Sequence, residues 1–132
     1  MKVLFVCLGN AFRSPLAEAL LKKYRPDIHV DSAGINPSIP ISEAAKRYLA
    51  KENAQQFLKQ TPESIDKKDL HSYDLIIVME PRQRNTLLNR CPECANKIVV
   101  WNIADPYFLP QESTEKIFRE IKGKVSELAS LL

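Results

Sequence analysis

Residues 2–15 read KVLFVCLGNAFRSP, and this stretch decides the fold. Its first part, Lys2–Val6, is a β-branched and aromatic run of the kind that forms a parallel strand buried on both faces. At its far end, Ser14 and Pro15 are typical of a helix start, with an N-cap serine followed by proline at the first helical position. The stretch therefore predicts a strand, a loop and a helix, which is the opening unit of an α/β domain.

The rest of the chain repeats this alternation of short apolar runs and helical spacing. Further strands are predicted at His29–Ala33, Asp74–Met79 and Lys97–Trp101. Further helices are predicted to begin at Ser42, at Pro81 and at about Ser113. Four strands that alternate with helices predict one domain over residues 1–132, with a four-stranded parallel sheet and helices on both faces.

The composition argues against several classes of protein. The chain has 132 residues, with 19 basic and 16 acidic side chains, and its net charge of +3 is too mild for a nucleic-acid binder. Its glycines, Gly9, Gly34 and Gly123, lie too far apart for a GxGxxG fingerprint or a Walker A loop. No apolar run approaches the ~20 residues of a membrane span. No nucleic-acid partner and no membrane partner are therefore expected.

Three cysteines, Cys7, Cys91 and Cys94, indicate a reducing compartment, because their number is odd and nothing suggests secretion. The apolar run at the N-terminus has only the minimum length of a signal peptide and is better explained as a strand. A cytoplasmic location is therefore expected.

The loop between the first strand and the first helix has the pattern of an anion-binding site. Cys7 and Arg13 lie six positions apart, so that successive backbone amides between them can point at one anion. Gly9 is expected to adopt a backbone angle closed to other residues, and Asn10 is expected to tolerate the left-handed region. The helix N-terminus and the planar fork of Arg13 add donors for phosphate oxygens. Together these groups are expected to stabilise the thiolate of Cys7.

Asp105 lies just past the fourth predicted strand. Ligands of parallel α/β sheets bind beyond the carboxyl ends of the strands. Cys7 and Asp105 are therefore expected to border the same crevice.

The residues Cys7–Pro15 closely resemble the signature of the low-molecular-weight protein tyrosine phosphatases. The segments Asp31–Gly34, Tyr73–Met79 and Asp105–Tyr107 look like the second strand, the third strand and the acid loop of that family, so the resemblance covers essentially the whole chain. It implies an enzyme that hydrolyses aryl phosphate monoesters through a phosphocysteine, acting on a phosphotyrosine protein or a small aryl phosphate. No metal and no cofactor are implied.

The resemblance also assigns the reacting groups. Cys7 would be the nucleophile, Arg13 would bind the phosphoryl group, and Asp105 would be the general acid. Tyr107 and Phe108 would grip the aryl ring of the substrate.

The remaining implied roles concern the shape of the loop. Asn10, Ser14 and Ser32 would form the hydrogen-bond network that holds it. Phosphate binding would fall to the loop residues Leu8, Gly9, Asn10, Ala11 and Phe12. Phe12 also marks a departure, because it occupies the position of a second loop cysteine, so a protective disulfide with Cys7 is not expected. Residues 60–63, QTPE, replace a His-x-x-Arg stretch of the family.

Cys91 and Cys94 form a CPEC motif that the phosphatase mechanism does not use. Three interpretations stay open: two cysteines that close a helix, a reversible disulfide, and a metal shared across a dimer. One CxxC supplies two of the four ligands of zinc, and no nearby histidine or cysteine is expected to complete the set. A ten-residue helix is expected to place the pair about 15 Å from the crevice.

Three other functions are compatible with a cysteine after the first strand. Thioredoxin-coupled arsenate reductases resemble the same fold and loop, but they need two relay cysteines, and those positions fall near Glu80 and Leu87. A cysteine phosphocarrier module of a sugar transport system has no use for Arg13 or Asp105. A non-enzymatic phosphoanion-binding module needs neither a nucleophile nor an acid. A phosphatase is therefore the favoured interpretation.

Overall fold

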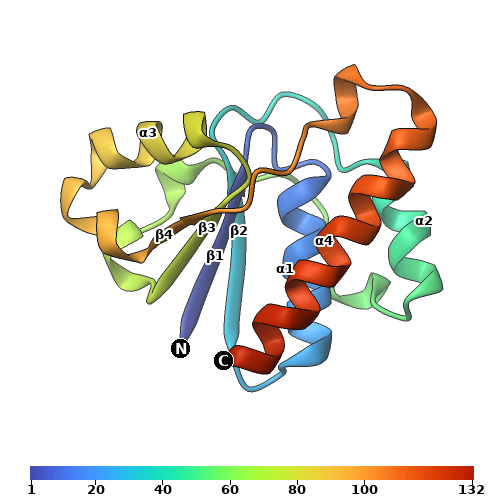
Figure 1. The fold of residues 1–132 in the computed structure, drawn as a ribbon, viewed down its shortest axis with the longest axis horizontal. Helices are drawn as coiled ribbons and strands as arrows, with labels where there is room; N and C mark the ends of the chain where they lie inside the picture. The colour runs from blue at the N-terminus through green and yellow to red at the C-terminus, as the bar shows by residue number, and fades with distance from the viewer.

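Figure 1 shows a parallel β-sheet with helices packed on both of its faces. This computed structural model describes the backbone of residues 1–132 and all side chains except that of Phe108. Among the described residues the sheet has four strands, in the spatial order β2-β1-β3-β4. They are β1 (Lys2–Cys7), β2 (His29–Gly34), β3 (Leu75–Val78) and β4 (Ile98–Val100). The predicted fold class and the four predicted strands are confirmed.

The α-helices of the described chain are α1 (Arg13–Tyr24), α2 (Glu43–Lys51), α3 (Pro81–Arg90) and α4 (Gln111–Leu131). In Figure 1, α1, α2 and α4 lie on one side of the sheet and α3 lies on the other. The predicted start of α2 is confirmed, because Ser42 Oγ accepts hydrogen bonds from the amides of Ala44 and Ala45. Within the described chain, no helix combines the length and the apolar character needed to cross a membrane.

Alternate residues of β1 point to opposite faces of the sheet and so belong to two separate cores. Val3, Phe5 and Cys7 belong to the core beneath α1 and α4. Leu4 and Val6 belong to the core beneath α3. Burial on both faces explains why this strand is a continuous apolar run.

The start of α1 differs from the prediction. The helix begins at Arg13 with Phe12, not Ser14, as its N-cap, and none of the described side chains caps it. The hydroxyl of Ser14 contacts the sulfur of Cys7 instead, so it is not used as a cap. The backbone N–H groups of the first turn of α1 therefore have no side-chain cap among the described residues and can donate to a bound anion.

The carboxyl ends of the described strands lie at one edge of the sheet. Cys7 lies opposite Gly34, Val6 lies opposite Val78, and Val78 lies opposite Val100. The loops that follow the strands converge at the upper edge of Figure 1. The loop after β4 contains a short 3-10 helix, η5 (Pro106–Phe108).

Candidate active site

A cavity of about 480 Å³ opens at this edge of the sheet. Cys7, Arg13 and Asp105 all line it, together with the loop residues Leu8, Gly9, Ala11 and Phe12. The cavity is therefore built where the loop after β1 and the start of α1 meet the loop after β4.

The sulfur of Cys7 is bound by two groups of its own loop. Its Sγ lies 2.9 Å from Ser14 Oγ and accepts a hydrogen bond from the amide of Asn10 at 3.2 Å. Ser14 Oγ in turn accepts from Asn10 Nδ2 at 2.8 Å, which leaves the hydroxyl proton for the sulfur, since the carbonyl of Ala33 is more distant at 3.5 Å. Both groups are therefore placed to donate hydrogen bonds to the sulfur of Cys7.

Asn10 is the centre of the hydrogen-bond network of the loop. Its φ is 52°, in the left-handed region that asparagine tolerates, and its side chain is fully buried. The amide nitrogen donates to Ser14 Oγ and to Ser32 Oγ, at 2.8 and 2.9 Å. The amide oxygen accepts from Lys59 Nζ and from the backbone of Glu63, at 2.8 and 2.9 Å. With both ends of the amide bonded, the loop has one defined shape before substrate binds.

Gly9 does not adopt the expected backbone angle. No glycine of the described chain has a positive φ, and the left-handed position belongs to Asn10. The glycine that the loop requires is Gly34, at the end of β2. A Cβ at Gly34 would lie 2.8 Å from the amide nitrogen of Asn10 and 2.9 Å from backbone atoms of Leu8 and Gly9. The loop therefore packs directly on the backbone of β2, where any side chain would collide.

Arg13 is buried, with 2% of its surface exposed, and it is anchored through one nitrogen. Its Nη1 donates to Glu80 Oε1 at 2.6 Å and to the carbonyl of Ile103 at 2.8 Å. Its Nη2 lies 3.4 Å from Asp105 Oδ2. Because a guanidinium group is planar, these contacts fix the orientation of the whole fork.

Glu80 is a site residue that sequence reasoning missed. It lies two residues after the end of β3. Gln83 positions it, because Gln83 Oε1 accepts from the amides of Met79 and Glu80 at 2.9 and 3.0 Å. Its position in the sequence could have predicted this role, since a carboxylate just beyond the carboxyl end of a parallel strand lies at the edge of the sheet where ligands bind.

Lys59 is a second residue that sequence reasoning missed. Its ammonium is almost buried and donates to Asn10 Oδ1 and to the carbonyl of Ser32, both at 2.8 Å. Ser32 Oγ donates to the buried carboxylate of Glu18 at 2.5 Å. The network behind the loop therefore includes an almost buried cation and a buried anion. Each has an ion-pair partner nearer the surface, Glu63 for Lys59 and Lys22 for Glu18. No local sequence pattern marks Lys59, because its partners belong to other elements.

Two carboxylates beside this network have lowered pKa values. Burial would raise the pKa of Asp31, but a hydrogen bond from Tyr73 Oη and the charge of Lys68 outweigh it. Burial would likewise raise the pKa of Glu63, but hydrogen bonds from Lys59 and Lys68 outweigh it. The pKa of Tyr73 is raised by burial and by its hydrogen bond to Asp31. These groups hold the segment before β3 against β2.

Asp105 lies beside Arg13 at the start of η5. Its Oδ1 accepts a hydrogen bond from the amide of Tyr107 at 3.0 Å, and its Oδ2 faces Arg13. Its side chain is 26% exposed, so a proton on the carboxyl group can exchange with solvent. The structure therefore brings Cys7, Arg13 and Asp105 together around one cavity.

The cavity has an apolar rim. Leu8 and Tyr107 line it and are exposed, and Ile39, from the loop after β2, adds a third apolar side chain that sequence reasoning missed. Phe12 lines the cavity but is only 8% exposed, and it packs edge-on against a tyrosine of α2. The side chain of Phe108 lies outside the described residues. An apolar rim of this kind suits the ring of an aromatic substrate.

Among the described residues that line the cavity, Cys7 and Asp105 are the ones whose side chains are common metal ligands. Other side chains of metal-binding type, His71, Cys91 and Cys94, lie together away from the cavity, beyond the end of α3.

The chain matches the family described as low molecular weight phosphotyrosine protein phosphatase over residues 2–132. The low molecular weight protein-tyrosine-phosphatase Wzb of Escherichia coli K12 is 31% identical, over 98% of this chain and 94% of its own. Wzb of Vibrio vulnificus, solved in complex with benzylphosphonate, has a TM-score of 0.85 and 30% identity, over 99% and 98% of the two chains. The YwlE arginine phosphatase from Geobacillus stearothermophilus has a TM-score of 0.86 and 26% identity, over 98% and 90%.

Proposed function

Because the chain belongs to the low molecular weight protein-tyrosine-phosphatase family, whose members are cysteine-dependent hydrolases, we propose that Cys7, Arg13 and Asp105 carry out its phosphatase reaction. The observation that carries this proposal is the sulfur of Cys7, which accepts hydrogen bonds from its own loop and lines the same cavity as a buried arginine. A nucleophile, an anion-binding group and an acid then face one bound phosphate monoester.

In the first step the thiolate of Cys7 attacks phosphorus in line with the leaving oxygen. A sulfur–phosphorus bond forms as the bond from phosphorus to the aryl oxygen breaks. Asp105, in its protonated form, donates a proton to that oxygen, so the leaving group departs as a neutral phenol.

In the second step a water molecule attacks the phosphocysteine. Asp105, now a carboxylate, takes a proton from the water, inorganic phosphate forms, and the sulfur–phosphorus bond breaks. The hydroxyl of Ser14 and the amide of Asn10 stabilise the departing thiolate of Cys7.

The amides of the loop and Arg13 hold the equatorial oxygens in both steps. Since Glu80 and the carbonyl of Ile103 bind Nη1 of Arg13, its Nε and Nη2 form the fork offered to phosphate. A bound phosphate then competes with Asp105 for Nη2 of Arg13. Substrate binding therefore releases the carboxyl group of Asp105 from its ion pair with Arg13.

The substrate we propose is a phosphotyrosine in a protein or a small aryl phosphate. The exposed apolar side chains of Leu8, Ile39 and Tyr107 offer contacts to an aromatic ring. A phosphoarginine would bring a cationic guanidinium against this apolar rim, and among the described lining residues Asp105 is the acidic side chain that could face it. We also propose a reducing, cytoplasmic site of action, because the reaction needs Cys7 as a free thiol.

The arsenate reductase alternative lacks a thiol relay. The positions expected for relay cysteines fall near Glu80, which binds Arg13, and near Leu87, which is buried in the core beneath α3. Cys91 and Cys94 follow α3, at the end away from Glu80. A relay from Cys7 would have to cross the length of that helix.

The experiment that tests the proposal compares four substrates on the same preparation: a phosphotyrosine peptide, a small aryl phosphate, a phosphoarginine peptide, and arsenate with a thioredoxin system. We expect turnover of the first two and at least roughly tenfold weaker activity on phosphoarginine, since burying an unpaired polar group costs about 1–3 kcal/mol and about 1.4 kcal/mol is a factor of ten. Arsenate reduction above the aryl phosphatase rate would overturn the proposal, and so would a preference for phosphoarginine.

A further inference from the structure

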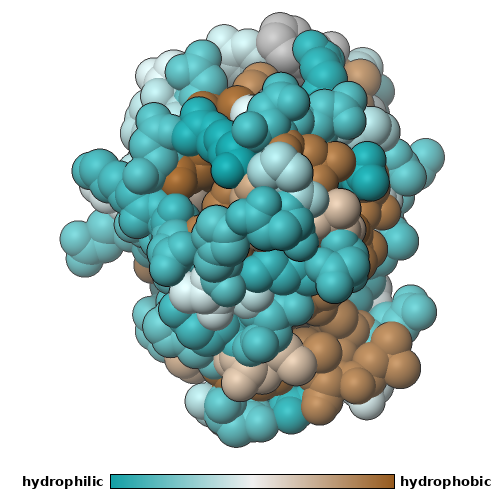
Figure 2. Space-filling model, turned by 90° about the vertical axis from the view of Figure 1, so that its left-hand side faces the viewer, coloured by the Kyte–Doolittle hydropathy of each residue, from teal (hydrophilic) through white to brown (hydrophobic). Residues whose placement is uncertain are grey.

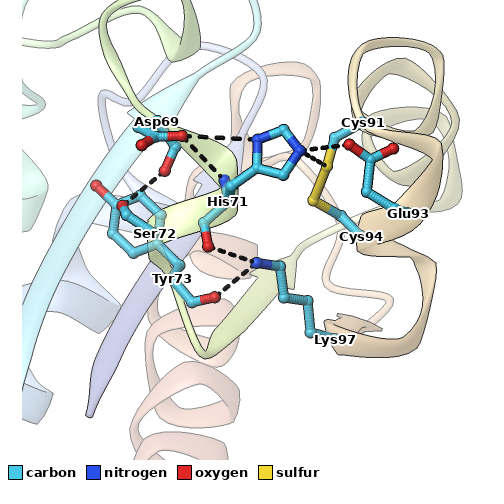
Figure 3. Close-up of a disulfide and its surroundings, with 8 residues drawn as sticks. All are labelled: Asp69, His71, Ser72, Tyr73, Cys91, Glu93, Cys94 and Lys97. Carbon is cyan, nitrogen blue, oxygen red and sulfur yellow. Dashed lines mark hydrogen bonds and ion pairs between the residues drawn. A yellow bond between two sulfur atoms is a disulfide. The ribbon is translucent and has the colours of Figure 1, made fainter.

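Three potential metal ligands meet beyond the end of α3 (Figure 3). Cys91 follows the helix, and Cys94 lies three residues later in the 3-10 helix η4 (Pro92–Lys97). His71 comes from another 3-10 helix, η3 (Leu70–Ser72), and its Nε2 lies 3.5 Å from Cys91 Sγ. The ligand atoms of the three side chains lie within 4.8 Å of one another. The expectation that no histidine lies near the CPEC motif is therefore wrong, because η3 packs beside it.

Two carboxylates flank the ring of His71, one at each nitrogen (Figure 3). Nε2, the nitrogen that faces Cys91, also contacts Glu93 Oε1. Nδ1 lies 3.7 Å from Asp69 Oδ1. A histidine that binds a metal through one nitrogen commonly directs its other N–H to a carboxylate, which fixes the tautomer of the ring. The contact with Nε2 makes Glu93 the candidate for a fourth ligand beside the three clustered side chains, and Asp69 is placed to orient His71.

The backbone holds these residues in place by bonds that do not involve the sulfur atoms. The amide of Cys91 donates to the carbonyl of Leu87, and the amide of Cys94 donates to the carbonyl of Cys91. Lys97 Nζ donates to the carbonyls of His71 and Tyr73, at 3.2 and 2.7 Å, and so ties η3 to the end of η4. The backbone positions of these residues are therefore held by bonds other than the disulfide that joins Cys91 and Cys94 in the structure, and only the two sulfur atoms must separate on reduction.

The cluster is closed on the protein side and open on the other. Cys91 and Cys94 are buried, whereas His71 and Glu93 each have 61% of the side chain exposed. A second cavity, of about 270 Å³, is lined by His71 and Cys91 and gives access from solvent. The face of the molecule that carries α3 is mostly hydrophilic (Figure 2), as suits the approach of a hydrated cation.

We propose that the dithiol form of this cluster binds one zinc-type divalent cation through Cys91, Cys94, His71 and Glu93. Two sulfurs, one imidazole nitrogen and one carboxylate oxygen make a four-coordinate set of the types that zinc uses. The disulfide is then the oxidised form, which cannot bind the metal, because each sulfur is bonded to the other. The metal would be bound within one chain and not shared across a dimer.

The two forms interconvert by a balanced exchange. A dithiol reductant gives two electrons and two protons to the disulfide, the sulfur–sulfur bond breaks, and the reductant becomes a disulfide. Binding of the cation then releases the two thiol protons to solvent, and the metal–sulfur bonds replace them.

This site is separate from the phosphatase centre. Glu80 precedes the first residue of α3, and Cys91 follows the last of its 10 residues, so the helix separates the two regions by about 15 Å. The metal therefore acts on the structure, by joining η3 and η4 at the end of α3. Its binding can be measured without any assay of phosphatase activity.

The test uses the full chain with Cys7→Ala, so that Cys91 and Cys94 are its only cysteines. Reduced and oxidised preparations are titrated with Co²⁺, whose visible bands report tetrahedral thiolate ligands, and then with Zn²⁺ against a chromophoric chelator. We expect the reduced chain to bind one equivalent of Co²⁺ with thiolate-to-cobalt absorption and one equivalent of Zn²⁺ in competition with the chelator. We expect the oxidised chain to show neither. Equal cobalt spectra for the reduced and oxidised preparations would overturn the proposal. This comparison uses the unchanged ligand residues, so it does not depend on whether a ligand variant folds.

Variants then identify the ligands. His71→Ala and Glu93→Gln should each weaken zinc binding, and Asp69→Asn should weaken it roughly tenfold to a hundredfold, as loss of a carboxylate behind a metal-bound histidine does. His29→Ala is the matched control, because His29 is an exposed histidine in β2 whose ring faces Asp31 and not a residue of the cluster. Unchanged affinity in His71→Ala, or an equal loss in His29→Ala, would contradict the assigned site.

Discussion

The carboxylate of Asp105 lies 3.4 Å from the guanidinium of Arg13, although one follows β4 and the other begins α1. This pair joins the proposed general acid to the proposed phosphate-binding group before any substrate is present. A phosphate that binds Arg13 therefore meets Asp105 at the same time.

Replacing Asp105 by Asn should lower kcat by roughly 10²–10⁴-fold, the usual contribution of a general acid. The loss should shrink for substrates whose leaving group is a weak base, because such a group departs without a proton. Steady-state kinetics with a series of substituted aryl phosphates measures this. Equal losses across the series would show that Asp105 does not donate the proton.

Replacing Glu80 by Gln should lower kcat/KM by roughly tenfold to a hundredfold, since a hydrogen bond to a charged group contributes about 1.5–3 kcal/mol. The physical reason is the 2.6 Å contact that orients Arg13, which an amide holds less strongly. Glu127→Gln, on the exposed face of α4, is the matched control and should leave kcat/KM unchanged. If Glu80→Gln also has parent kinetics, Arg13 is oriented without it.

Replacing Lys59 by Met should slow both turnover and alkylation of Cys7 by iodoacetamide at neutral pH. The amide oxygen of Asn10 then loses its bond to the ammonium, and the loop amide that faces the sulfur is held less firmly. Lys51→Met, at the exposed end of α2, is the control. A variant at Lys59 that loses thermal stability but keeps the parent alkylation rate would assign the lysine a purely structural role.

Replacing Gly34 by Ala should destabilise the fold by about 1–3 kcal/mol, the usual cost of overpacking, and should also reduce activity. Its Cβ would collide with backbone atoms of the loop, including the amide nitrogen of Asn10 at 2.8 Å. Gly123→Ala is the control, because a Cβ in α4 meets open space and should stabilise the helix by up to about 1 kcal/mol. Chemical unfolding compares the two, and equal effects would contradict the close approach of loop and strand.

Replacing Asp31 by Asn should destabilise the protein by about 1 kcal/mol at neutral pH. The pKa of Asp31 is lowered in the folded protein, because its hydrogen bond from Tyr73 and the charge of Lys68 outweigh burial. Its contribution is therefore complete above the ordinary pKa of 3.8 and is lost as the pH falls through the lower folded value. The difference between parent and variant should shrink below about pH 4. A difference that stays constant down to about pH 2 would contradict this assignment.

The sequence predicted the elements of the fold well, because burial on both faces makes the strands continuous apolar runs and proline or serine marks the helix starts. It also pointed to Cys7 and Asp105, since the ends of parallel strands must share one edge of the sheet, and to Arg13 through the pattern of the loop after β1. The predicted start of α1 was wrong. Ser14 matches the N-cap pattern locally, but in the folded protein its hydroxyl contacts the sulfur of Cys7.

The partners of the site could not be predicted in the same way. Glu80, Lys59 and His71 reach their partners from segments far away in the chain, so no local spacing reports their contacts. The requirement for glycine at Gly34 likewise depends on how closely the loop after β1 approaches β2, which only the packed structure shows.

The most direct test of the central claim is the mass of the protein quenched in acid during turnover of a phosphotyrosine peptide. The account predicts one added phosphoryl group, located on the peptide that contains Cys7, and predicts that Cys7→Ala shows neither the adduct nor turnover. A phosphoryl group on another residue, or substantial turnover by Cys7→Ala, would contradict a phosphocysteine mechanism.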